Sequence, residues 1–420
     1  MLKLNKELKV KLKVFKNDKR AYYGFLILAF LFITTLPAEL ICNVRPLIIV
    51  VEGKPYFPIP FTYSEKDFGG VLPSEPDYKS ARFLRILKGM PDAPATEASE
   101  KNTFILQLED LEEDAVEQPA FSIELDDFEV SDEPIAPIAE SLSVKTLSPR
   151  DPWILWPPIR YDYEYIPTES KTGNVVLAAP YRTRAPDGED FIESSWADGH
   201  YLGTDDRGRD VLARLLYGFR ISMLFGASLA ITGTLIGCLI GGTQGFFGGG
   251  VDLVGQRLTE IWGSIPRLYI LIILSSFLVP SAILLFLILN LTAWMGIAAY
   301  IRAEFLKVRN FEFVKAAKSL GVSNFTIMRR HILPNALTPV VTFFPFEVTA
   351  GILALVSLDY LNLGVPSPAP SIGELLAQGK NNLQALWILL PTFASLTLTI
   401  TLLTFIGEGI RNAFDPRKTL

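Results

Sequence analysis

The chain has 420 residues, 49% of them hydrophobic, and its net charge is −6. These values allow a large soluble fold or a membrane protein, and nothing in them indicates a nucleic-acid partner. Residues 21–36 and 221–242 carry no charge, whereas soluble helices of that length normally have a charged face, which favours a membrane protein. The cysteines and histidines are too few for a disulfide framework or a metal centre: Cys42, Cys238, His200 and His331.

The first 42 residues are predicted to form a cytoplasmic end and a first transmembrane helix. Residues 1–20 contain eight Lys or Arg against two acidic residues, and such a basic flank is typical of the cytoplasmic side. Residues 21–42 are longer than the core of a usual signal peptide, and the stretch from Pro37 to Glu39 is a poor cleavage site. We therefore expect a retained span rather than a signal peptide.

Residues 43–200 differ in composition and are predicted to form an acidic extracytoplasmic domain. They hold 30 acidic residues against 14 Lys or Arg, and they follow a span whose N-terminus lies inside. Aromatic and turn-rich pieces at both ends favour ordered structure with few or short strands. The middle, about 90–150, is rich in acids and prolines and is predicted to be a flexible insert.

Residues 201–220 are predicted to form an amphipathic helix along the outer membrane interface. Asp205 or Asp206 can begin such a helix, and its apolar side contains Val211, Leu212, Leu215 and Leu216. The arginines of this stretch are in tension with that placement, because basic residues usually lie on the inner side.

Residues 221–410 are predicted to form the core, with five more spans at about 221–243, 258–279, 281–301, 336–358 and 387–407. In the second span Gly233, Gly237 and Gly241 repeat every four residues, which favours close helix packing. The basic excess of residues 302–335 places that loop in the cytoplasm, and counting spans from an inside N-terminus gives the same side. Residues 411–420 then form a cytoplasmic tail.

The loop contains a compact motif at residues 310–335. Phe313, Ala317 and Leu320 recur at helical spacing, and Gly321 follows where a helix C-terminus needs a positive φ. Ser323 can begin a second short helix that stops near Pro334. The pattern predicts two small helices joined by a glycine turn, which is either an ordinary connection or a knob that another protein approaches closely.

Few residues in the chain could carry chemistry. An ionisable group at membrane depth usually faces the protein interior or a water path, so Glu347 is a candidate for the translocation path, unless it lies near an interface. Thr397 and Thr401 share one helical face and could line the same path, or simply bond to their own backbone. We find no nucleophile–base set, no convincing carboxylate pair and no metal-ligand spacing, so we expect no catalysis by this chain.

The motif at 310–335 resembles the coupling loop of binding-protein-dependent ABC importers. Lys315-Ala316-Ala317, then Gly321, then His331-Ile332-Leu333-Pro334 follow the family spacing, with Lys315 in place of a Glu and His331 in place of an Ile. Residues 203–211, GTDDRGRDV, match a box found ahead of the core in peptide-type permeases. Except for about 90–150, the chain resembles the second permease subunit of oligopeptide and dipeptide importers, in particular the Yej-type subunit associated with peptide and microcin C uptake.

This resemblance implies an all-α polytopic membrane protein. It would have six transmembrane helices of the type I ABC importer permease fold, and a large mixed extracytoplasmic insertion between helices 1 and 2. It implies a cytoplasmic (inner) membrane location with both termini inside. The implied partners are a second homologous permease subunit, two ATPase subunits that bind ATP and Mg²⁺, and a periplasmic peptide-binding protein. The residues implied in ATPase docking are Lys315, Ala316, Ala317, Gly321, Arg330, His331, Leu333 and Pro334.

Two other classes of function stay open from the sequence alone. A secondary transporter would be expected to show inverted repeats and intramembrane ion ligands, and no repeat is found. A membrane-anchored sensor or scaffold would use the acidic outer domain, but it would leave six spans and the motif at 310–335 unexplained. Which peptide is carried cannot be read from these residues.

Overall fold

The computed structural model describes residues 6–90, 151–167, 170, 173–184, 191–278 and 281–415. The expected flexible insert at about 90–150 therefore lies outside the described residues, apart from Met90. The chain divides into two units, one of residues 1–44 with 157–420 and the other of residues 45–156. The acidic region expected as one domain at 43–200 is thus split, because its last part, from Pro157, belongs with the helices.

The smaller unit is built on a three-stranded antiparallel sheet in the order β2-β1-β3. Its strands are β1 (Ile48–Val51), β2 (Lys54–Tyr56) and β3 (Trp153–Leu155), and Ile49 lies opposite Tyr56 on one side and Ile154 on the other. A 3-10 turn, η1 (Glu65–Phe68), and α4 (Ala81–Leu87) complete it. Its core is a cluster of aliphatic and aromatic side chains: Ile49, Val51, Phe68, Tyr78, Phe83 and Leu87.

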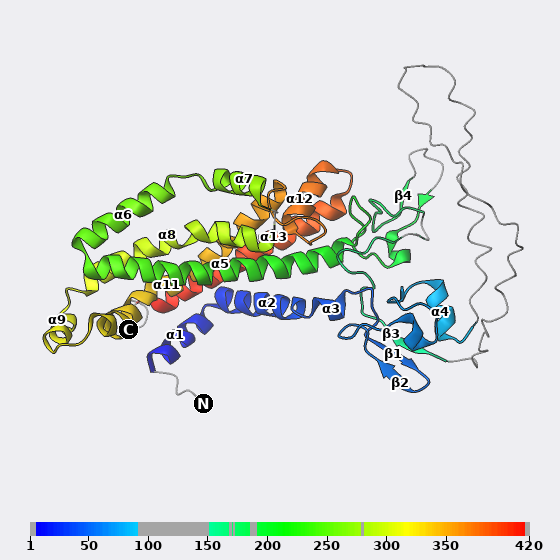
Figure 1. The fold of residues 1–420 in the computed structure, drawn as a ribbon, viewed down its shortest axis with the longest axis horizontal. Helices are drawn as coiled ribbons and strands as arrows, with labels where there is room; N and C mark the ends of the chain where they lie inside the picture. Colours follow the sequence, from blue (N-terminus) through cyan, green and yellow to red (C-terminus); the bar gives the residue numbers. More distant parts are fainter. Residues whose placement is uncertain are drawn as a thin grey trace, which may run out of the picture. The chain divides into compact units, whose positions relative to one another are not determined.

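The larger unit is mainly helical (Figure 1). Its elements before the long helices are α1 (Lys6–Asn17), α2 (Lys19–Thr35), α3 (Ala38–Ile41), β4 (Thr183–Arg184), β5 (Phe191–Ile192) and η2 (Ser195–Asp198). The elements that follow are α5 (Val211–Phe247), α6 (Gly249–Gly263), α7 (Arg267–Phe277), α8 (Ala282–Val308), α9 (Glu312–Ser319), α10 (Asn324–Thr326), η3 (Ile327–Ile332), α11 (Leu333–Tyr360), α12 (Ile372–Asn381) and α13 (Leu386–Phe414).

Helix α5 is the centre of the bundle, and its small residues set the spacing to its neighbours. The glycine stripe lies against α8: a Cβ at Gly233 would lie 3.3 Å from Ala293, and one at Gly237 would lie 2.9 Å from Ile297. At Gly241 a Cβ would overlap the backbone of Ala298. Residues later in α5 contact residues later in α8, so the two helices run in parallel. Their backbones pack close together.

Helix α11 runs against this direction, and α2 runs against α13. Gly226 in α5 faces Gly351 in α11, while Gly218, earlier in α5, faces the later Ile372 at the start of α12. Gly24 in α2 lies against Leu402 in α13, and Gly409 lies against Ala21. The ends of α5 and α8 and the starts of α2 and α11 therefore lie at one end of the bundle, together with the end of α13.

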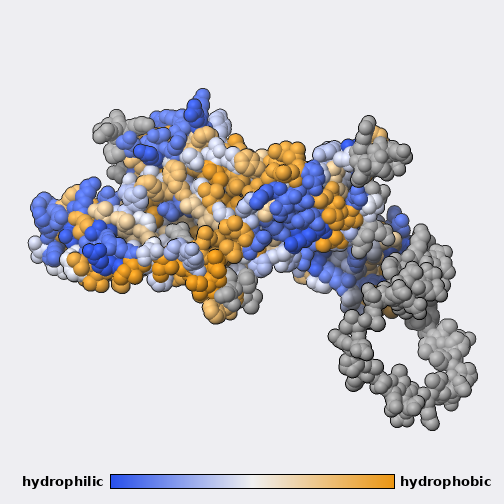
Figure 2. All heavy atoms as spheres, turned by 90° about the horizontal axis from the view of Figure 1, so that it is seen from above, coloured by the Kyte–Doolittle hydropathy of each residue, from blue (hydrophilic) through white to orange (hydrophobic). Residues whose placement is uncertain are grey.

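Four helical stretches in the described residues are long and apolar enough to cross a membrane: Val211–Phe247, Ala282–Val308, Asn324–Tyr360 and Leu386–Phe414. They contain the expected second, fourth, fifth and sixth spans. The expected first span, 21–42, is divided between α2 and the short α3, and the expected third span is divided between α6 and α7, with a break at 264–266. Figure 2 shows hydrophobic surface over the middle of the helices and hydrophilic surface at the end where α9 lies.

The structure corrects the helix expected at 201–220. Residues 201–210 form turns and an isolated bridge between Thr204 and Asp210, and residues from Val211 onward belong to α5. The helix begins at Asp210, whose carboxylate accepts a hydrogen bond from the backbone N–H of Ala213 at 2.7 Å. At 37 residues, α5 is about 55 Å long. That exceeds the ~30 Å apolar core of a bilayer, so its first turns project beyond the membrane.

Candidate functional site

The motif at 310–335 forms a knob at one end of the bundle, which we call the α9 knob (residues 310–335). Val314 and Ala317 on one side of α9 are 4% and 7% exposed. They pack in one cluster with Phe305, Ile327 and Ile332. Because the anchoring residues come from α8, α9 and η3 at once, the knob is held in a fixed position on the spans.

The turn inside the knob has the geometry that the sequence predicts. Gly321 has a φ of +75°, which favours glycine, and the N–H of Val322 donates to the carbonyl of Ala317 at 3.1 Å. Ser323 begins α10, where its hydroxyl accepts a 3.4 Å hydrogen bond from the N–H of Thr326. Nothing lies within 4 Å of a Cβ built on Gly321, so the turn is open on its outer side.

The outer side of the knob presents apolar side chains to the surroundings. Leu320 is 83% exposed and Phe325 is 70% exposed, while Phe311 and Phe313 are both more than 40% exposed. These exposed apolar groups make the knob a candidate surface for contact with another protein. The Lys315 ammonium lies 3.1 Å from the Glu312 carboxylate in an exposed pair.

The residues that the resemblance implies in docking occupy different positions in the knob. Lys315, Ala316, Gly321, Arg330 and Pro334 are exposed. Ala317, in contrast, is buried and anchors α9, whereas His331 and Leu333 are half-buried. Only the exposed group can meet a partner directly. Sequence reasoning did not single out Leu320 and Phe325 as exposed apolar side chains, although Leu320 directly precedes the glycine turn.

The expected stop at Pro334 is not observed. α10 passes through the π-helical turn η3 into α11, so that 324–360 is one continuous helical stretch. Pro334 lies in the first turn of α11, where its missing N–H costs least, and the wider π-helical turn before it leaves room for the ring. The knob is therefore continuous with a membrane-length helix.

The opposite end of the bundle holds a buried group of charges, which we call the arginine cluster (Asp205, Arg209, Arg214 and Glu374). Arg209 Nη2 lies 2.7 Å from Asp205 Oδ2 and 3.2 Å from Glu374 Oε1. Arg214 Nη2 lies 2.5 Å from Glu374 Oε2. Both guanidinium groups are almost completely buried. Buried charges of this kind are tolerated only when they are paired.

The electrostatics of Arg209 show how the cluster is balanced. Burial by itself lowers the pKa of Arg209, but the hydrogen bond to Asp205 and the charge of Glu374 outweigh it and raise that pKa above its ordinary value. Arg214 also donates to the backbone carbonyls of Tyr163 at 2.9 Å and Pro368 at 3.3 Å. The cluster therefore connects the start of α5 to segments that are distant from it in the sequence.

The cluster accounts for two of the four arginines that conflicted with an interfacial helix. Arg209 and Arg214 are turned inward onto carboxylates. Arg220 pairs with Glu39 instead, and the side chain of Arg207 is 51% exposed. Sequence reasoning could not find the pairing, since Glu374 comes 160 residues after Arg214. The adjacent His200–Asp210 pair, at 2.9 Å, stacks on Tyr161 with ring centroids 3.9 Å apart and extends the buried polar region.

Among the described residues, no contact brings Glu347 together with the two threonines predicted for a translocation path. Glu347 is half-buried in α11. Thr397 and Thr401 are exposed on α13, and the Thr401 hydroxyl donates to the Thr397 carbonyl at 2.8 Å, as the backbone alternative predicted. A groove of about 540 Å³ lies instead between α5, α6 and α8, with Gln244 and Asn290 among its lining residues.

A bundle of membrane-length helices, with paired charges buried at one end and an anchored knob with exposed apolar side chains at the other, is typical of a polytopic membrane protein. Residues 233–420 match the family described as the binding-protein-dependent transport system inner membrane component. The peptidoglycan transport system permease protein YejE of Agrobacterium fabrum is 38% identical over 413 residues, covering 96% of this chain and 92% of that protein. The chain therefore belongs to the binding-protein-dependent transport system inner membrane component family.

Two further relatives show how far the likeness extends. The inner membrane ABC transporter permease protein YejE of Escherichia coli is 36% identical over 406 residues, covering 97% of this chain and 96% of that protein. The oligopeptide transport system permease protein OppC of the same species is 37% identical over 248 residues, covering 58% of this chain and 82% of that protein. The match to YejE of Agrobacterium fabrum thus spans almost the whole chain, whereas the match to OppC covers 58% of it.

Proposed function

We propose that this chain is the membrane-spanning permease subunit of an ATP-driven importer for peptides or peptide-like compounds. The observation that carries the proposal is the α9 knob, which is anchored on buried Val314 and Ala317 and exposes Leu320 and Phe325 at one end of an apolar bundle. The relatives named as oligopeptide and peptidoglycan transport permeases support the peptide class. The chain itself contributes the pathway and the docking surface rather than catalysis.

The complex that this function requires has several subunits. A second, related permease completes the pathway, two ATPase subunits bind ATP and Mg²⁺ and dock on the knobs, and a soluble binding protein delivers the peptide on the other side. No cofactor binds to this chain in the proposal. An apolar groove between α5, α6 and α8 faces away from the chain's own core and suits contact with the second permease.

The proposed topology places both termini and the knob in the cytoplasm. The basic residues of 1–20 and 302–335 support that side. The packing directions give support, since α2 begins and α13 ends at the same end of the bundle as the knob. Six spans then follow if α2 and the broken pair α6–α7 are counted with the four membrane-length helices. Residues 43–200 are extracytoplasmic in this topology, because they follow the outer end of the first span.

The mechanism follows from the continuity of the knob with α11. When ATP binding closes the ATPase pair, the partner pushes the knob at residues 311–334, and the spans rock between inward and outward openings. The partner can bias this equilibrium only by binding one state more tightly than the other. Glu347, Thr397 and Thr401 remain our candidates for the path, and Glu347→Gln is expected to reduce uptake without reducing ATPase association.

The test is Gly321→Val. A β-branched side chain does not suit a φ of +75°, so the turn must rearrange. We expect ATP hydrolysis to continue without uptake, with normal amounts of the protein in the membrane. Gly250→Val is the matched control, because Gly250 does not have a positive φ and a Cβ there meets nothing within 4 Å. Normal uptake by the Gly321→Val protein would contradict the proposal.

Purification from the native membrane in a mild detergent separates the proposal from its alternatives. We expect a second permease and ATPase subunits to accompany the chain, as identified by mass spectrometry. Recovery of the chain alone, under conditions that preserve other membrane complexes, would favour the secondary transporter or the sensor.

A further inference from the structure

A second groove lies where α1 crosses α2 and α13, near the chain's two termini. Its volume is about 340 Å³, within the range of ligand sites. Its lining is apolar except for two lysines at the rim. The lining residues are Lys11, Leu12, Phe15 and Lys16 from α1, Tyr22 and Phe25 from α2, and Ile406, Ile410, Ala413 and Phe414 from α13.

The groove is built by specific contacts between the three helices. A Cβ at Gly409 would overlap that of Ala21 and lie 3.1 Å from the ring of Phe15, so α13 can approach α1 and α2 only because a glycine is present. The rings of Phe15 and Phe25 meet edge to face at 6.4 Å. The Lys11 ammonium lies 4.3 Å from the centroid of the Phe414 ring. These contacts fix α1 at an angle to the spans.

The charge around the groove is of one sign. On a helix with 3.6 residues per turn, Leu12 and Phe15 form one stripe, and Lys11 and Lys16 flank it on either side. None of the described residues that line the groove is a carboxylate. Among the described residues neither lysine takes part in a salt bridge. An occupant must therefore offer an apolar body and a negative head.

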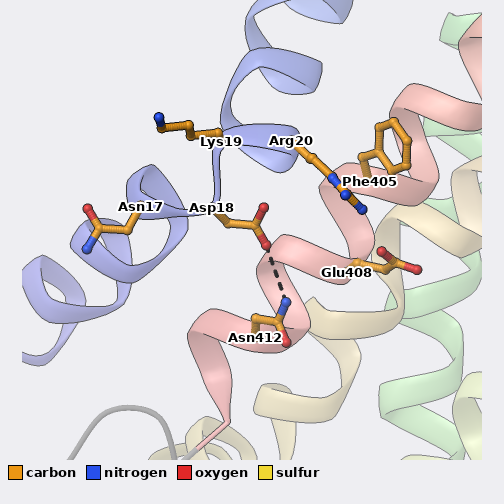
Figure 3. A pocket seen from close by; sticks show the side chains of 7 residues that line it. All are labelled: Asn17, Asp18, Lys19, Arg20, Phe405, Glu408 and Asn412. Atoms are coloured by element: carbon orange, nitrogen blue, oxygen red, sulfur yellow. Dashed lines mark hydrogen bonds between the residues drawn. The ribbon is translucent and has the colours of Figure 1, made fainter.

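A neighbouring cleft provides a contrast (Figure 3). It is lined by Asn17, Asp18, Lys19, Arg20, Phe405, Glu408 and Asn412. Its two basic side chains are balanced by two acidic ones, and Asn412 donates to the Asp18 carboxylate at 3.3 Å. The balanced cleft has no net charge to attract an anion, so the basic apolar groove is the distinctive feature.

We propose that the groove binds an anionic phospholipid. An acyl chain lies against Leu12, Phe15 and Phe25, and Lys11 and Lys16 hold the phosphate. A basic amphipathic helix with Leu and Phe on its apolar side is suited to the membrane interface, and each lysine there favours anionic lipid. The inference requires the proposed membrane placement of α2 and α13, but it does not require an ATPase partner or a peptide substrate.

The test measures which lipids the purified full-length protein retains. The full-length protein is reconstituted in nanodiscs of phosphatidylcholine with one third phosphatidylglycerol and extracted in mild detergent, and bound lipid is counted by native mass spectrometry. We expect the wild type to retain phosphatidylglycerol selectively. The double variant Lys11→Gln/Lys16→Gln should lose about 30-fold in that selectivity, on the scale of two basic residues near an anionic surface. Glutamine preserves the helix, because its helix propensity matches that of lysine.

The matched control is Lys9→Gln/Lys13→Gln. It removes the same charge from the same helix, but neither residue lines the groove. We expect it to retain phosphatidylglycerol like the wild type. Equal loss in both double variants would overturn the site, because a diffuse attraction to α1 explains that result. Equal retention of phosphatidylcholine by the wild type would also overturn it.

A third variant tests the apolar half of the site with the charges intact. Leu12 is 43% exposed, so Leu12→Trp fills the groove without disturbing the buried core. We expect loss of the retained lipid although both lysines remain. Unchanged retention would show that the acyl chain lies elsewhere and would contradict the proposal. None of these outcomes depends on uptake, so failure here leaves the proposed transport function untouched.

Discussion

The two ends of the helical bundle differ in which side chains they bury and which they expose. At the arginine cluster, charged side chains are buried, and each is neutralised by a partner from the same chain: Arg209 and Arg214 share Glu374. At the α9 knob, apolar side chains are exposed, and Leu320 and Phe325 have no cover from the chain itself. One end is complete within this chain, whereas the proposed function covers the other end with an ATPase subunit.

This difference predicts that substitutions at one end affect the stability of the fold and substitutions at the other affect partner binding. Changes at the arginine cluster should act on folding, because they leave buried charge without a partner. Changes at the exposed side of the knob should leave folding intact and act on the partner. The same substitution made at both ends therefore tests the comparison directly.

The largest effect is expected for Glu374→Ala. It leaves Arg209 and Arg214 with Asp205 alone, and removing one partner of a buried ion pair costs about 3–5 kcal/mol. Thermal unfolding in detergent should show a large loss of stability. Glu312→Ala at the knob removes a carboxylate whose side chain is 91% exposed, and it should change nothing measurable. Similar losses in the two variants would refute the contrast between the ends.

Two glycines with the same backbone conformation provide the next test. Gly203 and Gly321 both have a φ of +75°. At Gly321 a Cβ meets nothing, so Gly321→Ala should cost about 1–2 kcal/mol for the left-handed conformation alone. At Gly203 a Cβ would lie 2.5 Å from the carbonyl of Ala178 and 2.7 Å from the Trp387 ring, which adds about 1–3 kcal/mol of overpacking. Equal destabilisation in thermal unfolding would count against the structure around Gly203.

Leu320→Ser should affect the partner only. The side chain is 83% exposed, so stability should change by less than about 0.5 kcal/mol. Exposed apolar anchors contribute much of the affinity at interfaces, so ATPase association should fall by about tenfold or more. Leu361→Ser, at the other end of α11 and 52% exposed, is the control and should retain the ATPase in co-purification. Loss in both variants would indicate a general defect.

The smallest effect is expected for Lys315→Gln. The pair with Glu312 is exposed on both sides, and such pairs contribute little to stability. Unfolding should be unchanged at low and high salt. Arg302→Gln is the comparison, because its guanidinium and the Asp252 carboxylate are both mostly shielded from solvent. A stability loss for Lys315→Gln as large as that for Arg302→Gln would show that the knob depends on its surface charges.

The sequence predicted local features well and distant pairings poorly. The glycine turn at Gly321 and the Ser323 helix start follow from a few neighbouring residues, and the structure has both. The start of α5 was misplaced, because Asp205, Asp206 and Asp210 are equally good N-caps from local chemistry alone. Choosing Asp210 requires knowing that Asp205 already binds Arg209.

The span boundaries show the same limit. The hydrophobic run from 258 to 279 indicated one helix, whereas the chain breaks at 264–266, where Pro266 precedes α7. The acidic region was read as one domain by composition, although Tyr161 packs with Cys42 and Tyr217 of the helical unit. Composition reports the average environment of a segment, but not which side chains meet.

The helical stretch from Asn324 to Tyr360 would transmit the push of the partner in the proposed mechanism. It is 37 residues and therefore about 55 Å long, with the knob at one end and Asp359 at the other. Asp359 accepts hydrogen bonds from Ser371 and from the backbone of Val365, so the far end is fastened to the loop before α12. In the proposed mechanism, a small tilt imposed at the knob displaces the far end of this stretch sideways, and the length of the stretch sets how far that end moves.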